Sequence, residues 1–374
     1  MVLIIIVAFI SLILLMVIHE LGHFLLAKKF GVKVEEFGIG YPPKIFGKKF
    51  GETIYSLNLL PFGAFVRITG ESEAINNPRS FSTKPFYQKA LIILGGVVSF
   101  WIISFLIFTV IMVTGVPTQI DDNETGNFRN PKVQILAVAP NSPAKTAGIK
   151  IGDTILKTRN LKSLPAIAFG DSRWQAGEIR NIDKIKDFQD FVSENKGQEI
   201  ILTMQRGKTI FDLPIVPRQN PPENEGALGV ALARTALTNY PWYIAPLKGV
   251  QVTFNFTKLA LSGWITAITR LVKNQPTGVE LMGPVGIFGL FVQAGQMGVT
   301  YFFQLVAIIS IFVALMNILP IPSTDGGKLL FLIIEKIKGK PISQKITQNI
   351  EMAFFSLLII LLIVITIKDI GKLF

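Results

Sequence analysis

The stretch Ile18-His19-Glu20-Leu21-Gly22-His23 stands at the end of an uncharged run that begins at Val2. On an α-helix, residues four apart share a face, so His19 and His23 can turn their imidazoles toward one metal ion while Glu20 projects beside them. The chain has 2 histidines, and both lie in one of its most apolar parts. Because ionisable groups at membrane depth are costly to keep, we interpret the pair as a metal site rather than as solvated interfacial histidines.

The composition is that of a membrane protein, since 50% of the 374 residues are hydrophobic and 17% are charged. The cysteine count of 0 excludes disulfides, thiolate metal ligands and a cysteine nucleophile. The net charge of +12 comes from lysines and arginines that cluster beside apolar runs, which indicates membrane topology and not nucleic-acid binding. The apolar N-terminus lacks a positive n-region and a small-residue cleavage site, so we expect a retained span and no signal peptide.

Hydropathy predicts about four transmembrane helices, at residues 2–26, 90–114, about 301 onward, and 352–367. Clusters of lysine follow the first and third of these spans and precede the second, which predicts that these helix ends are cytoplasmic and that both chain ends lie outside. The fourth span is short for a membrane core. Residues 242–273 mix aromatic, small and cationic side chains, and this mixture predicts an amphipathic or interfacial helix.

A second distinctive stretch ends the long uncharged run of residues 281–324: Asn317-Ile318-Leu319-Pro320-Ile321-Pro322-Ser323-Thr324-Asp325-Gly326-Gly327. Its two prolines and two glycines are expected to break or distort the helix just where a carboxylate appears. Unwound backbone at membrane depth is tolerated only where protein or a wet cavity shelters it. Asp325 is therefore a candidate functional residue, and the predicted topology brings it to the same side and depth as His19 and His23.

Between the first two spans, residues 53–57 and 65–68 are strand-like and flank Pro61-Phe62-Gly63, which predicts a β-hairpin. The pattern favours two interpretations about equally: a hairpin that only packs on a small cytoplasmic surface, or one whose free edge pairs with an extended substrate backbone.

Residues 131–218 have the composition of a soluble module, with strands predicted at 133–138, 154–156, 200–204 and 209–215 and helix at 140–144 and 183–192. Residues 161–178, which include Trp174, look like an insertion. The module follows the second span, so we expect it to be extracytoplasmic.

Three features together resemble the site-2 protease family of intramembrane zinc metalloproteases, in its bacterial RseP-like branch. They are the HExxH motif at the end of a first span, the distant NxxPxPxxDGG motif on a third span, and a GxxxGD-bearing β module between spans two and three. The stretches Gly283-Pro284-Val285-Gly286-Ile287 and Gly63-Ala64-Phe65 add to the resemblance. The module that carries Ser142-Pro143-Ala144 and Gly152-Asp153 resembles a bacterial PDZ domain.

The resemblance implies a polytopic α-helical membrane protein with about four transmembrane helices, a reentrant β-hairpin and an inserted extracytoplasmic α+β PDZ-like domain. The membrane domain would comprise residues 1–114 and 221–374, and the PDZ-like domain residues 115–220. The implied site residues are the zinc ligands His19, His23 and Asp325, the catalytic acid/base Glu20, the substrate-holding Asn317, and the substrate-binding hairpin residues Gly63, Ala64 and Phe65.

The implied function is cleavage, by a zinc endopeptidase, of transmembrane segments in single-span membrane proteins such as anti-sigma factors or remnant signal peptides. The implied location is the lipid bilayer of the bacterial plasma (inner) membrane, with the active site near the cytoplasmic side. The departures from the family pattern at Thr324, Lys328 and Gly95-Gly96-Val97-Val98-Ser99-Phe100 concern substrate positioning more than chemistry.

Two other functions compete with proteolysis as explanations of the sequence. One is an inactive scaffold that binds single-span proteins through the PDZ-like module, and the intact Glu20, His19, His23 and Asp325 argue against it. The other is a zinc transporter, which needs polar residues across the whole membrane, whereas this chain offers one cluster on one side.

Overall fold

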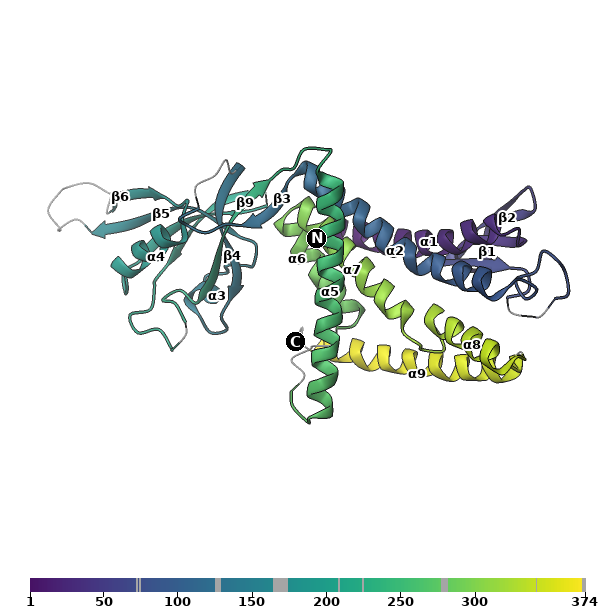
Figure 1. Ribbon diagram of the computed structural model, residues 1–374. Coiled ribbons are helices and arrows are strands. Elements are labelled where there is room, and N and C mark those ends of the chain that lie inside the picture. The colour runs from purple at the N-terminus through teal and green to yellow at the C-terminus, as the bar shows by residue number, and fades with distance from the viewer. Residues whose placement is uncertain are drawn as a thin grey trace. The chain divides into compact units, whose positions relative to one another are not determined.

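The structure is a computed structural model that describes residues 1–71, 73, 75–124, 129–163, 174–207, 209–223, 225–276, 282–340 and 342–371 (Figure 1). The chain forms two compact units. The first comprises Met1–Val110, Tyr243–Phe291 and Phe303–Phe374, and the second comprises Ile111–Trp242 and Val292–Phe302.

The helices are α1 (Val2–Lys29), α2 (Phe86–Thr114), α3 (Pro143–Thr146), α4 (Ile185–Glu194), α5 (Ala245–Val272), α6 (Pro284–Met297), α7 (Val299–Ile318), α8 (Asp325–Lys338) and α9 (Gln344–Gly371). The strands are β1 (Val34–Phe50), β2 (Thr53–Ile68), β3 (Val116–Gln119), β4 (Arg129–Val138), β5 (Thr154–Ser163), β6 (Trp174–Asn181), β7 (Ile200–Arg206), β8 (Thr209–Ile215) and β9 (Val230–Thr238).

Within the described residues, 4 helices are long and apolar enough to cross a membrane, namely α1, α2, α7 and α9. This confirms the four spans and makes the protein a multi-pass membrane protein. The expectation of a short fourth span was wrong, because α9 has 28 residues and continues through the charged positions Lys345, Glu351, Lys368 and Asp369. Charges near both ends had concealed its length. The helix predicted at 242–273 is present as α5, which does not meet the criteria for a span.

Asp369, in the last turn of α9, explains the Gly283-Pro284-Val285-Gly286 motif. Its Oδ2 atom accepts hydrogen bonds from the backbone N–H groups of Gly283 and Gly286, both at 2.8 Å. Gly286 lies in the first turn of α6 and Gly283 directly precedes it, a place where N–H donors have no partner in their own helix. The buried carboxylate therefore fastens the start of α6 to the end of a membrane span.

The replacement Asp369→Ala is expected to lower the free energy of unfolding by about 1–3 kcal/mol, because it leaves two donors without an acceptor. Thermal unfolding in detergent measures this loss. Asp369→Asn keeps an acceptor oxygen, and its loss should be smaller. Equal loss in both variants would contradict the capping role.

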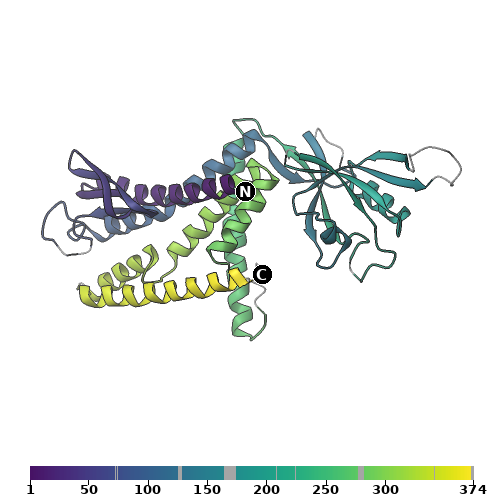
Figure 2. The same cartoon turned by 180° about the vertical axis from the view of Figure 1, so that it is seen from behind.

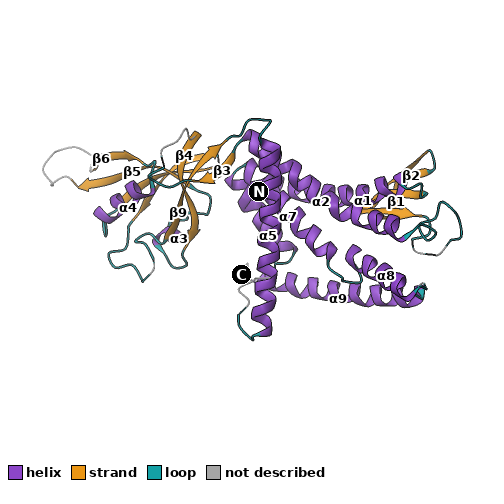
Figure 3. Ribbon diagram, viewed as in Figure 1, coloured by secondary structure: helices purple, strands orange, loops and turns teal. Residues whose placement is uncertain are grey.

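Strands β1 and β2 form an antiparallel sheet against α1 (Figure 3). Residues 36–39 of β1 pair with residues 54–57 on one side and with residues 64–67 on the other, and residues 46–50 pair with residues 53–57. The predicted pairing of 53–57 with 65–68 was therefore wrong, because β1 lies between them. The sequence of β1 concealed it, since lysines, Gly38, Gly40 and the Pro42-Pro43 pair interrupt the alternation of a strand.

A buried cluster joins this sheet to the helices that carry the histidines and Asp325. Its buried members are Ala27, Val32, Val34, Ile68, Phe81, Ile92 and Ile93, and Leu329 and Leu332 of α8 pack against them. Side chains from α1, both strands, α2 and α8 thus share one core. Apolar burial of this kind fixes the relative positions of these elements at the cytoplasmic end predicted from the lysines.

The second unit contains a 7-stranded sheet in the order β3-β9-β4-β5-β7-β8, with β6 beside β5 (Figure 2). All of the strands and both helices predicted for the module are present. Asp153 of the GxxxGD motif accepts hydrogen bonds from Arg206 Nε at 2.7 Å and Nη2 at 2.6 Å. This pairing raises the pKa of the Arg206 guanidinium and locks the turn before β5 onto β7.

The expected domain end at residue 220 was wrong, because β9 pairs with β4 over Val230–Val138 to Leu237–Arg129 and completes the sheet. The Pro-rich stretch 220–224 is thus a loop inside the module. The predicted insertion at 161–178 forms the outer parts of β5 and β6, which pair with each other, while residues 164–173 lie outside the described part of the chain.

Candidate metal centre

Three ligand atoms from two distant parts of the chain converge. His19 Nε2 and His23 Nε2 lie 3.3 Å apart, and each lies 3.3 Å from Oδ2 of Asp325. All three residues are buried. Within the described residues, they form the one cluster of three or more His, Asp or Glu side chains that could hold a metal ion. The sequence prediction that helix spacing and membrane topology would bring Asp325 to the histidines agrees with this geometry.

The hydrogen bond that His23 makes through Nδ1 fixes its tautomer, so that Nε2 presents its lone pair to the triangle. Its Nδ1 atom lies 2.9 Å from the carbonyl oxygen of Ile92. Since a carbonyl can only accept, Nδ1 carries the proton, and in the neutral ring Nε2 is an acceptor. A hydrogen bond of this kind is the usual way in which a protein orients a metal-binding histidine.

His19 is fixed by packing instead. Its ring stacks on Phe100 of α2, with centroids 4.8 Å apart and planes 18° apart. Phe100 is fully buried, so the ring of His19 has little freedom to turn away.

Asp325 is delivered by a tight loop between α7 and α8. The Thr324 hydroxyl donates to the carbonyls of Leu319 and Ile321, at 2.9 Å each. Asp325 then opens α8, where the helix dipole favours a carboxylate. The sequence suggested that the two glycines help to break the helix, but Gly326 and Gly327 lie within α8. They lie in its first turn, where a Cβ at Gly326 would approach the carbonyl oxygen of Leu319 to 2.2 Å.

The triangle fits zinc. Neighbouring ligands of a tetrahedral zinc ion with bonds of about 2.0 Å lie about 3.3 Å apart, so three such atoms form one face of the tetrahedron. Oδ2 of Asp325 is also buried with no hydrogen-bond donor among the described residues. Converging acceptors with no donor between them are unfavourable unless a cation lies there. Two imidazole nitrogens and one carboxylate oxygen leave a fourth position open, which is typical of a catalytic zinc site.

Gly96 of α2 sets how closely α2 approaches the two rings. A Cβ atom at this position would lie 2.2 Å from His23 Nε2 and 2.7 Å from His19 Cε1. Neither ring can yield, since one is held by Ile92 and the other by Phe100.

We expect Gly96→Ala to lower zinc affinity by at least about 10- to 100-fold, the range seen when residues that orient metal ligands are replaced. Zinc competition with a chelator measures this. The control is Gly289→Ala, because a Cβ at Gly289 meets nothing within 4 Å. Unchanged zinc affinity in Gly96→Ala would contradict the close packing described.

The Glu20 side chain is half-buried and makes no hydrogen bond or ion pair with other described residues. It follows His19 directly in α1. Asn317 lies in the last turn of α7, where its amide donates to the carbonyl of Val313 at 3.0 Å. The structure therefore ties the Asn317 side chain to its own helix.

The hairpin residues lie beside the HExxH helix. A Cβ at Gly63 would lie 3.6 Å from Met16 of α1, one turn before His19. Ala64 is buried, and Phe65 stacks on Tyr41 with ring centroids 6.3 Å apart. Residues 64–68 pair with β1 along one edge, while their other edge has no strand partner among the described residues.

The sequence connected Gly96, Phe100 and Lys328 only with substrate positioning and did not point to Ile92, whereas the structure places Ile92, Gly96 and Phe100 of α2 against the two histidines. The Lys328 ammonium contacts Glu71 at 2.7 Å, and the Glu71 charge raises the pKa of Lys328, so this lysine stays cationic. Its position one turn after Asp325 was the available signal, because residues three apart on a helix are neighbours.

The chain matches the model of Peptidase family M50 over residues 7–361. It is 31% identical to a putative zinc metalloprotease from Clostridium perfringens, over 95% of each chain. It is 27% identical to the regulator of sigma-W protease RasP from Bacillus subtilis, again over 95% of each, and 25% identical to the probable protease eep from Enterococcus faecalis, over 96% of this chain and 97% of that one. The chain belongs to peptidase family M50, the site-2 protease family, and is a zinc metalloprotease of the site-2 type.

Proposed function

We propose that this enzyme cleaves peptide bonds within the transmembrane segments of single-span membrane proteins. The observation that carries the proposal is the buried triangle of His19, His23 and Asp325, in which the histidines belong to the spanning helix α1 and Asp325 follows the spanning helix α7 after a short loop. A hydrolytic site at this place can reach a peptide bond that lies within a transmembrane segment of the substrate.

In this proposal His19, His23 and Asp325 hold the zinc ion and Glu20 is the catalytic acid/base. Zinc, when bound, supplies a Lewis acid that acidifies water and polarises a carbonyl oxygen. The Glu20 carboxylate takes the proton of the attacking water and returns it to the leaving amine as the carbon–nitrogen bond breaks. Asn317 is proposed to hold the substrate backbone by turning its amide from Val313 toward it.

The free edge of β2 is proposed to bind the substrate as an added strand. A peptide bond inside a helix is shielded by its own hydrogen bonds, so the substrate span must unwind before attack. Unwinding leaves N–H and C=O groups unpaired in an apolar medium, which is costly. The edge at Gly63, Ala64 and Phe65 can pair with them, and Met16 places this edge one turn from His19.

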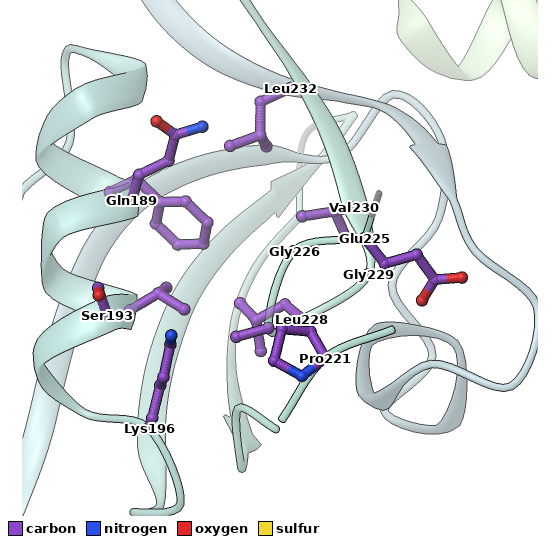
Figure 4. Close-up of a pocket in the computed structure, with 13 residues that line it drawn as sticks. Gln189, Ser193, Lys196, Pro221, Glu225, Gly226, Leu228, Gly229, Val230 and Leu232 are labelled. Carbon is purple, nitrogen blue, oxygen red and sulfur yellow. The ribbon is translucent and has the colours of Figure 1, made fainter. Parts of the chain in front are cut away.

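The sheet module is proposed to be an extracytoplasmic PDZ-like domain that binds the C-terminus of a peptide. Its pocket lies between α4 and the start of β9, and the side chains of Val230 and Leu232 point from β9 toward α4 (Figure 4). Residues 230–233 of β9 pair with β4 along one edge. Their other edge has no strand partner among the described residues, because β3 pairs with β9 only from Thr235 onward.

The loop 226–229 closes one end of this pocket. The N–H groups of Ala227 and Leu228 donate to no backbone carbonyl within the described part of the chain. Such a loop beside a free strand edge can receive a terminal carboxylate while the strand edge pairs with the peptide backbone. The apolar lining of the pocket favours an apolar last residue.

Peptides ending in valine with a free carboxylate are expected to bind at least about tenfold more tightly than the same peptides amidated, because a charge-assisted hydrogen bond is lost. Fluorescence anisotropy on the full protein measures this. Val230→Asp should abolish the difference, whereas Ile210→Asp on exposed β8 should not. Equal binding of both peptides by the native protein would contradict carboxylate capture.

The proposed site of cleavage is tested with a single-span substrate and the protein in lipid nanodiscs. Mass spectrometry of the products should place the cut inside the apolar span. A helix-breaking residue in the span should increase the rate. Cleavage confined to the substrate's soluble flanks would overturn the proposal.

Proteolysis at the membrane of a bacterium, with anti-sigma factors or remnant signal peptides as substrates, is the biological setting that we propose. The names of the relatives support it, since one is a regulator of sigma-W protease and all three of those named above are bacterial.

A further inference from the structure

An apolar groove lies between α2 and α5, and the mechanism does not use it. The groove has a volume of about 400 Å³ and is lined by Trp101, Ile102, Phe105, Val250, Thr253, Phe254 and Thr257. The polar atoms of the lining side chains are already paired. Trp101 Nε1 donates to the Thr257 hydroxyl at 3.1 Å, and the hydroxyls of Thr253 and Thr257 donate to carbonyls of their own helix. The groove therefore presents hydrocarbon alone.

The groove lies where α5 crosses α2 (Figure 1). At that place a Cβ on Gly249 would lie 2.4 Å from Thr109 Oγ1, and the rings of Phe108 and Phe256 stack with centroids 5.5 Å apart. The α2 side of the groove belongs to a helix that is long and apolar enough to cross a membrane.

The positive charge of α5 favours an anionic lipid. Residues 226–279 contain no aspartate or glutamate, while α5 itself carries Lys248, Lys258 and Arg270. Lys258 is exposed and follows the groove residue Phe254 by one helical turn, on the same side of α5. Further along α5, Leu261, Ile265 and Ile268 are exposed on one face. A cationic helix with an apolar face is typical of segments that lie in the interface of an anionic bilayer.

We propose that the α2–α5 groove binds one acyl chain of an anionic glycerophospholipid, with the phosphate of its headgroup near Lys258. The volume is within the range of small-molecule sites, about 300–1,000 Å³. It would hold only about one turn of a helix about 10 Å across, so a flexible hydrocarbon chain fits better than a substrate span. The bound lipid would fix α5 against the span that carries Gly96 and Phe100, next to the metal centre.

The test uses Trp101 as the reporter. The chain has 4 tryptophans, so Trp174, Trp242 and Trp264 are replaced by phenylalanine in the full protein. This protein is reconstituted into phosphatidylcholine vesicles that contain the same small fraction of dibrominated phosphatidylglycerol or dibrominated phosphatidylcholine. Bromine quenches a tryptophan that it contacts. We expect phosphatidylglycerol to be preferred by about fivefold, since a cation near an anionic headgroup contributes about that factor.

Two kinds of variant test the groove itself. Ile102→Phe and Val250→Phe fill it with exposed side chains and should remove the headgroup preference, whereas Ile268→Phe, on the same helix outside the groove, should not. Lys258→Gln should lower the preference about fivefold, and Lys186→Gln, an exposed lysine of the sheet module, should leave it unchanged.

Equal quenching by both brominated lipids in the native groove would show contact with bulk lipid only and would overturn the proposal. So would a headgroup preference that survives both groove-filling variants. A photo-crosslinker at Val250 that captures a model substrate span, with no lipid preference, would assign the groove to substrate and equally reject the lipid.

Discussion

The variant Glu20→Gln is expected to keep its zinc and to lose about 100- to 10,000-fold in kcat, the usual contribution of a general acid/base. Glutamine has nearly the shape of glutamate but cannot take a proton from water. The metal triangle of His19, His23 and Asp325 does not include Glu20, so zinc should remain at one ion per chain.

Single-turnover cleavage of a single-span substrate and zinc analysis of the same preparation measure the two quantities together. Glu194→Gln is the matched control, because Glu194 is exposed on the sheet module, where it pairs with Arg180. A Glu20→Gln enzyme with near-native kcat would remove Glu20 from the chemistry. Loss of zinc along with activity would assign it a structural role instead.

The variant Asp325→Ala is expected to bind zinc more than about 100-fold more weakly and to be inactive at ordinary zinc concentrations. Replacing residues that only orient a ligand already costs about 10- to 100-fold, and Asp325 is proposed to supply a ligand atom itself. Without this carboxylate, His19 and His23 are the two ligands that remain of the three-residue site.

Zinc retention during dialysis against a graded series of chelators gives the change in affinity. Asp187→Ala, at an exposed position of α4, should retain zinc like the native protein. Asp325→His restores a nitrogen ligand and should recover part of the affinity, which separates ligand loss from misfolding. Native zinc retention in both Asp325→Ala and His23→Ala would place the metal elsewhere.

The convergence of His19, His23 and Asp325 could be predicted from helix spacing together with membrane topology. The spacing of His19 and His23 is a property of any helix, and only the side of the membrane had to be inferred to bring Asp325 to them. Asp325 also needed the resemblance to a known family, because a carboxylate after two prolines has no unique meaning by itself.

The residues that hold the ligands could not be predicted, because their effect depends on how α1 packs on α2. Nothing in the local sequence says that Ile92 offers its carbonyl to His23 or that Gly96 faces both imidazoles. The same is true of β1. Its glycines, prolines and lysines obscure a strand, and its pairing on both sides with β2 is a long-range contact.

Two boundaries failed for a related reason. The Pro-rich stretch before β9 has the composition of a linker, yet the sheet resumes after it through pairing with β4. The charges at the ends of α9 suggested a short span, although Asp369 is buried by hydrogen bonds to Gly283 and Gly286. Composition describes a segment's average environment, and in both cases a specific partner determined the structure.

Zinc K-edge X-ray absorption on the purified native protein tests the central claim most directly. The account predicts one zinc per chain with nitrogen and oxygen neighbours at about 2.0–2.2 Å, the scattering pattern of two imidazoles, and loss of that pattern in His23→Ala. Absence of zinc, or a zinc site without imidazole scattering, would contradict it.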